Sequence, residues 1–251
     1  MALDETLLEG YLAGDGASSP PTLRLYSWRP ATLSLGKSQR FEDGCDPDYL
    51  REQGIGLVRR PTGGQAVLHE YERTYAVVGR LDRAPFDAGV LACYEAISAA
   101  LRRALSSFGF EIGTASHQPP RPLREKNPVC FAEPSAHELL VDEKKIVGSA
   151  QLRRRQAFLQ HGSILLRADP TRLQRAIGVA PQPTPMVDLE QLIGRMPTED
   201  ELDQALIAGF SEQFALEFDA IQLSVDERAE MTRRRTFKYL SESWTVRSDV
   251  S

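Results

Sequence analysis

A cysteine and a lysine fifteen positions apart form the pair best suited to covalent chemistry. They are Cys130 and Lys145, in the stretch VCFAEPSAHELLVDEKKIVGSAQ at 129–151. A thiol attacks as the thiolate, and a nearby ammonium lowers the thiol pKa from about 8.5. If this stretch folds back on itself, Lys145 could lower the pKa of Cys130. The lysine could also move the proton when an amine attacks an acyl-enzyme. The more common role of a lone cysteine is that of a small buried residue, here beside Phe131.

A glycine-rich cluster, RRPTGGQAVLHE at 59–70, offers a second site. The pair Gly63-Gly64 allows positive φ and exposes backbone amides that a ligand can approach closely. Arg59 or Arg60 beside it supplies a charge for a phosphate or carboxylate, and His69 lies at the far end of the returning strand. The alternative is a plain β-hairpin turn with two solvated arginines.

A histidine-glycine step in QHGSILL, at 160–166, is a weaker signal. His161 and Gly162 stand between two apolar strand segments. On this pattern alone, the step is most simply a bulge with a core histidine. The other two cysteines, Cys45 in an acidic loop and Cys93 in an apolar helix, are assigned structural roles.

Short apolar patterns predict the elements that must position these residues. Helices are expected at 3–13, at about 89–108, from Asp169-Pro170 to 177, and at about 198–217, where Thr198 and Glu201 form a capping box. Strands are expected at 22–28, 31–38, 54–60, 65–70, 73–81, 156–161 and 163–168, with a hairpin over 137–151 that turns at 142–144. Many strands with few intervening helices favour an α+β fold with mixed or antiparallel sheets flanked by helices.

The composition excludes several classes of protein. Of the 251 residues, 41% are hydrophobic and the formal net charge is −5, which argues against bulk affinity for nucleic acid or an acidic membrane surface. Three cysteines imply no disulfide framework and favour a reducing compartment. The start MALDETLLEGYLA lacks signal-peptide features, and no apolar run is long enough to span a bilayer. We therefore expect a cytoplasmic protein.

Taken together in this order, RRPTGGQAVLHE, KKIVGSAQ and LQHGSILL resemble the lipoate/biotin protein ligase superfamily. The pattern CF-x-x-PS ahead of the lysine hairpin looks like the cysteine-dependent octanoyltransferases of that superfamily. The resemblance runs from the first residues to about 180 and continues more loosely to the end. It implies the superfamily's catalytic-domain fold, with 1–180 as the core and 181–251 as a helical extension of the same domain.

The resemblance also implies roles for individual residues. Cys130 would be the nucleophile and Lys145 its catalytic partner, while residues around the two glycine motifs would line an acyl pocket or tunnel. These substrate-binding residues would be Arg60, Gly63, Gly64, Ala66, Val67, His69, Gly148, Ser149, Ala150, His161 and Gly162.

The implied reaction moves an octanoyl group from acyl carrier protein, through a cysteine thioester, to a lysine of a lipoyl domain such as the glycine-cleavage H protein. No metal or cofactor is expected, and neither nucleic acid nor membrane is an expected partner. Two departures stand out. Gln65 stands where the family usually has glycine, arginine or another residue, which suggests a turn shaped for a particular carrier. Family members also usually have a short strand before the segment that MALDE matches, so we expect that this strand is absent or that the start was assigned late.

Two alternatives remain. An ATP-dependent lipoate ligase, which would need ATP and Mg²⁺, shares the glycine turn, the lysine and the His-Gly strand, but it commonly needs an accessory domain of about 80 to 100 residues. The segment after 180 leaves too little chain for one. The second alternative is a non-catalytic module that binds lipoyl domains. Such a module would need none of Cys130, Lys145 and His69, so the presence of all three argues against it.

Overall fold

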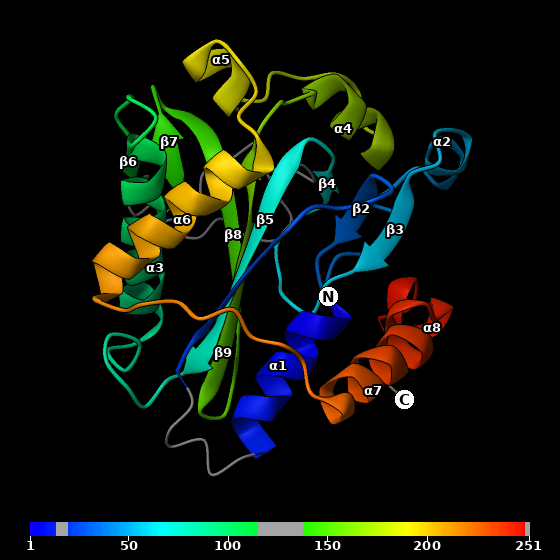
Figure 1. Ribbon diagram of the computed structural model, residues 1–251. Coiled ribbons are helices and arrows are strands. Elements are labelled where there is room, and N and C mark those ends of the chain that lie inside the picture. Colours follow the sequence, from blue (N-terminus) through cyan, green and yellow to red (C-terminus); the bar gives the residue numbers. More distant parts are fainter. Residues whose placement is uncertain (14–19, 115–137, 249–251) are drawn as a thin grey trace.

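Two β-sheets set side by side organise the chain (Figure 1). The computed structural model describes residues 1–13, 20–114 and 138–248. The strands are Thr22–Tyr26 (β1), Thr32–Leu35 (β2), Gly56–Arg59 (β3), Val67–His69 (β4), Glu72–Arg80 (β5), Gly113–Thr114 (β6), Leu139–Val141 (β7), Lys144–Arg154 (β8) and Ala157–Leu165 (β9). The helices are Ala2–Ala13 (α1), Pro47–Glu52 (α2), Val90–Ser106 (α3), Pro170–Ile177 (α4), Leu189–Ile193 (α5), Glu199–Phe214 (α6), Val225–Arg234 (α7) and Glu242–Thr245 (α8), with a π-helical turn at Arg235–Tyr239 (η2).

The larger sheet has six antiparallel strands in the order β1-β5-β9-β8-β7-β6. Two of its interior strands, β5 and β9, are buried along nearly their whole length. The segment 156–168, predicted as two strands, instead contains one continuous strand, because His161 and Gly162 pair regularly with β5 and β8 on either side. The His-Gly bulge considered from the sequence is therefore wrong.

The smaller sheet has three strands in the order β3-β2-β4. β2 lies in the middle, parallel to β3 and antiparallel to β4. The two strands that flank the glycine turn thus do not pair with each other, and the hairpin alternative for RRPTGGQAVLHE is wrong. The short helix α2, which the sequence patterns did not predict, supplies the crossover that parallel strands require.

Helices cover both faces of the six-stranded sheet (Figure 1). On one face, α3 and α6 pack together over the sheet, and Gly209 of α6 fits closely against the backbone of Ala100 and Ala104. On the other face lies α1, with α7 beside it. Alternate residues of each strand of the larger sheet face these two helical layers. The larger sheet is antiparallel and the smaller one is mixed, so the predicted α+β class with mixed or antiparallel sheets is confirmed.

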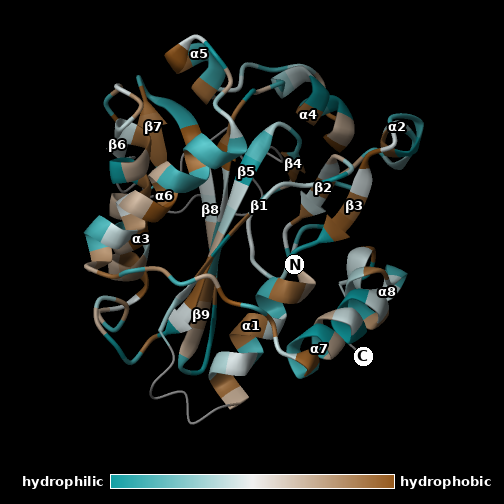
Figure 2. Ribbon diagram, in the orientation of Figure 1, coloured by the Kyte–Doolittle hydropathy of each residue, from teal (hydrophilic) through white to brown (hydrophobic). Residues whose placement is uncertain are grey.

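The C-terminal helices contact elements from the first half of the chain. α6 packs on α3, α7 on α1, and α8 on β3. Figure 2 shows mostly hydrophilic residues along α7, which has no buried residue. The division into a core at 1–180 and an extension at 181–251 stays a prediction.

Helix ends follow their sequence signals. Thr198 and Glu201 form the predicted capping box at the start of α6, and Asp169 caps α4 directly before its proline. Within the described ranges, no helix is both long and apolar enough to cross a membrane.

Candidate active site

Arg60 organises the glycine turn from within the protein. Its guanidinium donates hydrogen bonds to the carbonyl oxygens of Gly63 (2.9 Å), Gln65 (2.7 Å) and Ser34 (3.0 Å). The arginine is buried although the two glycines are exposed. Such charge-assisted bonds to three carbonyls fix the path of the turn. The guanidinium of Arg60 thus binds backbone carbonyls of the turn. From the sequence, this arginine was expected to supply a charge for an anionic ligand.

Positive φ is needed at only one of the two glycines. Gly64 has φ of +98°, while the φ of Gly63 is not positive and open space surrounds the place where its Cβ would lie. The positive φ that the glycine pair allows is therefore used at Gly64. A third glycine, Gly36, makes the close contact instead, because a Cβ there would overlap the carbonyl oxygen of Gly64.

Arg59 has a structural environment. It is completely buried, and its guanidinium donates to carbonyl oxygens of Gly36 (2.7 Å), Trp244 (3.1 Å) and Thr245 (3.1 Å). The indole of Trp244 donates back to the Arg59 carbonyl at 2.8 Å. Arg59 therefore ties α8 to the loop that carries Gly36.

His69, at the end of β4, is held on three sides. Its Nε2 lies 2.8 Å from the hydroxyl of Ser34, and its Nδ1 lies 3.3 Å from a carboxylate oxygen of Glu72. The indole of Trp28 stacks on the imidazole, with ring centroids 4.3 Å apart. Glu72 is buried and accepts hydrogen bonds from Thr74 and Ser163 at 2.6 Å. Such contacts fix the ring orientation of His69.

His161, in the middle of β9, is buried and neutral. Burial lowers its pKa to about 3, with the positive charge of Arg60 contributing in the same direction. Its Nε2 lies 2.6 Å from the hydroxyl of Thr62, which joins the larger sheet to the glycine turn. A neutral imidazole here supports the geometry of the turn and adds no charge to the site.

The segment Gly148-Ser149-Ala150 lies within β8. Ser149 Oγ lies 2.7 Å from the hydroxyl of Tyr75. Gly162 is required opposite it, because a Cβ there would overlap the Gly148 carbonyl oxygen and lie 2.5 Å from the Tyr75 ring. The hydroxyls of Ser149 and Tyr75 lie on the side of the larger sheet that α3 covers. His161 instead points toward Thr62, in the turn between two strands of the smaller sheet.

Lys145, the second residue of β8, is 1% exposed, while its neighbour Lys144 is exposed. Its Nζ lies 2.5 Å from a carboxylate oxygen of Glu138, which is also buried. Its backbone is fixed as well, since its N–H donates to Pro185 and its carbonyl accepts from Val187. Only one of these two adjacent lysines therefore points inward.

Cys130 lies outside the described residues, so its distance from Lys145 stays a prediction. The other two cysteines, Cys45 and Cys93, are free and buried. Burial raises the pKa of each to about 11. Neither thiol is therefore ionised at neutral pH, as expected for structural cysteines.

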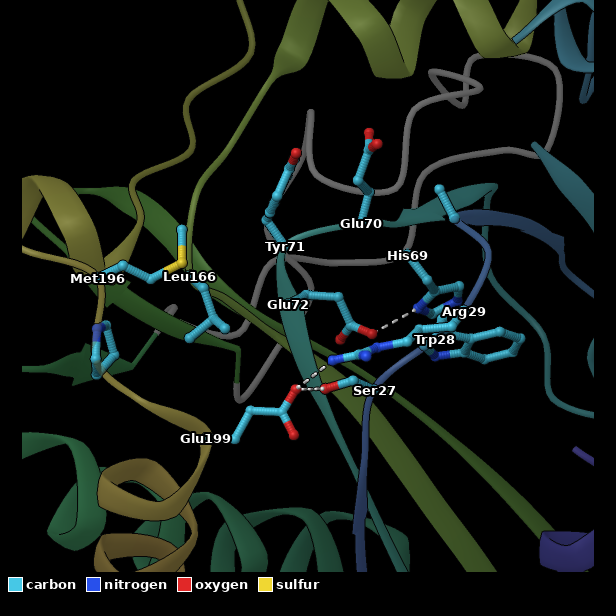
Figure 3. Close-up of a pocket in the computed structure, with 12 residues that line it drawn as sticks. Ser27, Trp28, Arg29, His69, Glu70, Tyr71, Glu72, Leu166, Met196 and Glu199 are labelled. Atoms are coloured by element: carbon cyan, nitrogen blue, oxygen red, sulfur yellow. Dashed lines mark hydrogen bonds and ion pairs between the residues drawn. The ribbon is translucent and has the colours of Figure 1, made fainter. Parts of the chain in front are cut away.

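A pocket of about 330 Å³ opens beside His69 (Figure 3). This volume lies within the usual range of small-ligand sites. In the figure, Glu72 points at His69, Leu166 and Met196 form one wall, and the segment with Trp28 forms another. The lining comprises Ser27, Trp28, Arg29, Ala31, His69, Glu70, Tyr71, Glu72, Leu166, Met196, Pro197 and Glu199.

A smaller cavity of about 30 Å³ lies next to this pocket. Glu70 and Tyr71 line both cavities, and Met186, which lines the smaller one, forms a β-bridge with Lys145. Val67 packs against Leu165 in the same region, whereas Ala66 is buried in the core of the smaller sheet. Of the predicted substrate-binding residues, His69 alone lines the larger pocket.

The sequence patterns did not single out several residues of this region. Glu138 and Glu72 are buried carboxylates, but in the sequence each looks like an ordinary charged residue at a strand end. Trp28 had the clearest available signal, because it is one of only two tryptophans in the sequence and stands among polar residues in Ser-Trp-Arg-Pro. Among the described residues, no group of His, Cys, Asp and Glu could hold a metal ion.

Comparison with known proteins agrees with this arrangement. Residues 1–211 match the family described as the lipoyl protein ligase A/B catalytic domain. The chain is 37% identical over 262 residues to the octanoyltransferase LipM of Kyrpidia tusciae, with 98% of this chain and 93% of that protein covered. It is 35% identical over 257 residues to the octanoyltransferase LipM of Carboxydothermus hydrogenoformans, with the same coverage.

Among solved structures, protein Ta0514 of T. acidophilum is similar over 98% of this chain and 92% of its own. That protein is assigned as a lipoate protein ligase and was solved with bound lipoic acid; the TM-score is 0.79 and the identity 25%. The resemblance seen in the motifs and the predicted fold type are therefore confirmed.

Proposed function

This chain belongs to the lipoyl protein ligase A/B catalytic domain family, and on that premise we propose that it is an octanoyltransferase that works through a thioester on Cys130. The donor is octanoyl-acyl carrier protein, and the acceptor is a lysine of a lipoyl domain such as the glycine-cleavage H protein. The observation that carries the proposal is the buried Lys145, held in place on β8 by Glu138 and by its own backbone.

The first step exchanges one thioester for another. The Cys130 thiolate attacks the octanoyl carbonyl, the new carbon–sulfur bond forms, and the carrier thiolate leaves with a proton from the Lys145 ammonium. Thioester exchange changes the free energy little, so the step needs no ATP. Cys130 is the thiol that fits this role, because burial keeps Cys45 and Cys93 protonated.

In the second step the acceptor amine attacks the Cys130 thioester. An amide forms, the Cys130 thiolate leaves, and neutral Lys145 takes the proton that the amine loses. The lysine thus returns to the ammonium form and the thiolate is regenerated. Neither step needs a metal or an organic cofactor.

We assign the acyl chain to the pocket at His69 and to the smaller cavity next to it, which Met186 lines. Trp28, Leu166 and Met196 provide apolar wall there, and burial of each methylene contributes about 0.8 kcal/mol. Arg60 holds the glycine turn through the Gly63 carbonyl, and Thr62 of that turn contacts His161 of β9. We place the reaction in the cytoplasm, where free thiols such as those of Cys45 and Cys93 persist.

The test is the intact mass of the protein after incubation with octanoyl-acyl carrier protein, without ATP and without a lipoyl domain. A hydroxylamine-labile octanoyl adduct should form, and Cys130→Ser should prevent it. Cys45→Ala and Cys93→Ala are matched controls that should keep both the adduct and transfer to a lipoyl domain.

The competing function is an ATP-dependent ligase, the assignment of the structural neighbour. In that case Cys130→Ser would stay active with free octanoate and ATP, and wild-type protein would form no adduct from the carrier. That result would rule out the thioester route.

A further inference from the structure

The pair Glu138–Lys145 places two full charges inside the protein. Glu138 is 4% exposed and Lys145 is 1% exposed, with Oε1 and Nζ 2.5 Å apart. Glu and Lys are almost never fully buried unless they are paired. A buried ion pair is nevertheless a weak source of stability, because desolvation of both charges offsets their attraction. An apolar pair of similar size would serve the fold as well, so the charges suggest a chemical role.

The geometry fixes both ends of the pair. Glu138 stands one residue before β7, and Lys145 pairs with Leu140 of that strand, so the carboxylate reaches across the β7–β8 hairpin. The backbone of Lys145 is held by the segment 185–187. Because neither backbone can move far, the carboxylate decides where the flexible lysine side chain places its nitrogen.

Among the described residues, two phenols also interact electrostatically with Glu138. Burial raises the pKa of Tyr75, on β5, to about 12, and the Glu138 charge contributes to the rise. Burial also raises the pKa of Tyr94, on α3, and Glu138 again contributes. Both phenols stay neutral at physiological pH, so among these groups Lys145 is the charged partner of Glu138.

We propose that Glu138 is a positioning residue of the acyl-transfer reaction, holding the Lys145 nitrogen in place at the acyl carbonyl. This proposal rests on the proposed function insofar as Lys145 acts on the acyl group. It covers both the thioester and the adenylate route, because each uses the lysine at the same carbonyl.

The experiment compares Glu138→Gln, Glu138→Asp, Lys145→Met and the double variant Glu138→Gln/Lys145→Met. Glu143→Gln, an exposed carboxylate at the turn of the same hairpin, is the matched control. kcat and KM are measured with octanoyl-carrier or with octanoate plus ATP, whichever supports turnover by wild-type protein. The wild-type result tests the proposed function, and the ratios among variants test the role of Glu138.

Glu138→Gln should lower kcat at least about tenfold and change KM for the donor less than about threefold. Glu138→Asp should recover part of the loss, because it keeps the charge. The double variant should be no slower than Lys145→Met, since a residue that acts through Lys145 has no effect once the lysine is gone. Glu143→Gln should match wild type.

Two results would overturn the proposal. One is an unchanged kcat for Glu138→Gln with only a lower urea midpoint, which would make the pair purely structural. The other is a double variant in which the two losses multiply. If Glu138→Gln fails to fold, Glu138→Asp alone tests the proposal. Its carboxylate is one methylene shorter and should lower kcat at constant KM. An unchanged kcat would refute the role of Glu138.

Discussion

The fit of Gly36 against the glycine turn makes a prediction that the motif itself does not. A Cβ at Gly36 would overlap the Gly64 carbonyl oxygen and lie 2.9 Å from its carbon and 3.3 Å from the carbonyl carbon of Gly63. The turn would have to retreat by about 1 Å or more to restore ordinary contact. Arg60 holds the carbonyls of Gly63 and Gln65 at 2.9 and 2.7 Å, so this shift would break at least one charge-assisted bond.

The expected cost of Gly36→Ala follows from these contacts. Overpacking against backbone typically costs about 1–3 kcal/mol, and a lost hydrogen bond to a charged group adds about 1.5–3 kcal/mol. We expect a loss of about 3–5 kcal/mol, a large part of the stability of an ordinary domain. Gly63→Ala is the matched control, because open space surrounds its Cβ and its φ is not positive. It should change stability by less than about 1 kcal/mol.

The assay is urea unfolding followed by tryptophan fluorescence, together with octanoyl transfer to a lipoyl domain. Gly36→Ala should lower the unfolding midpoint by about 1 M or more and reduce transfer at least about tenfold. Gly63→Ala should keep the wild-type midpoint even if it slows transfer by contact with substrate. Equal midpoints for both variants, or a lower one for Gly63→Ala, would refute the assignment of Gly36 as the residue that supports the turn.

Three further outcomes are expected. Lys145→Ala should reduce transfer about 100-fold while Lys144→Ala is close to neutral, and equal losses in steady-state assays would contradict the observed strand register. Trp28→Ala should enlarge the pocket at His69 and shift the preference toward longer acyl chains; an unchanged ranking in a competition between octanoyl and dodecanoyl donors would remove that pocket from the site. Because the pKa of His161 is about 3 in the folded protein, this imidazole is protonated only in the unfolded state between pH 6.5 and about 3. The free energy of unfolding should therefore fall by about 2 kcal/mol from pH 7 to pH 5. His161→Gln should flatten this part of the curve of unfolding free energy against pH, and an unchanged slope would contradict a neutral, buried imidazole.

Local patterns in the sequence were enough for most of the elements and for part of the site. The apolar spacing of α3, the capping box of α6 and the proline after Asp169 predict their helices because helix ends and faces depend on neighbours within a few residues. The strand period of two likewise predicts that only one of the adjacent residues Lys144 and Lys145 points inward. Three motifs in order were sufficient to indicate the family.

What the tertiary structure decided are the contacts between residues far apart in the chain. β2 inserts between the strands that flank the glycine turn, Gly36 packs against Gly64, and Arg59 holds the carbonyl of Trp244, 185 residues away. The opposite charges of Glu138 and Lys145 likewise become a buried pair only when the hairpin folds against the segment at 185–187. Local sequence cannot specify such contacts, because a side chain's periodicity shows which face it lies on, whereas its partner depends on how whole sheets and helices pack.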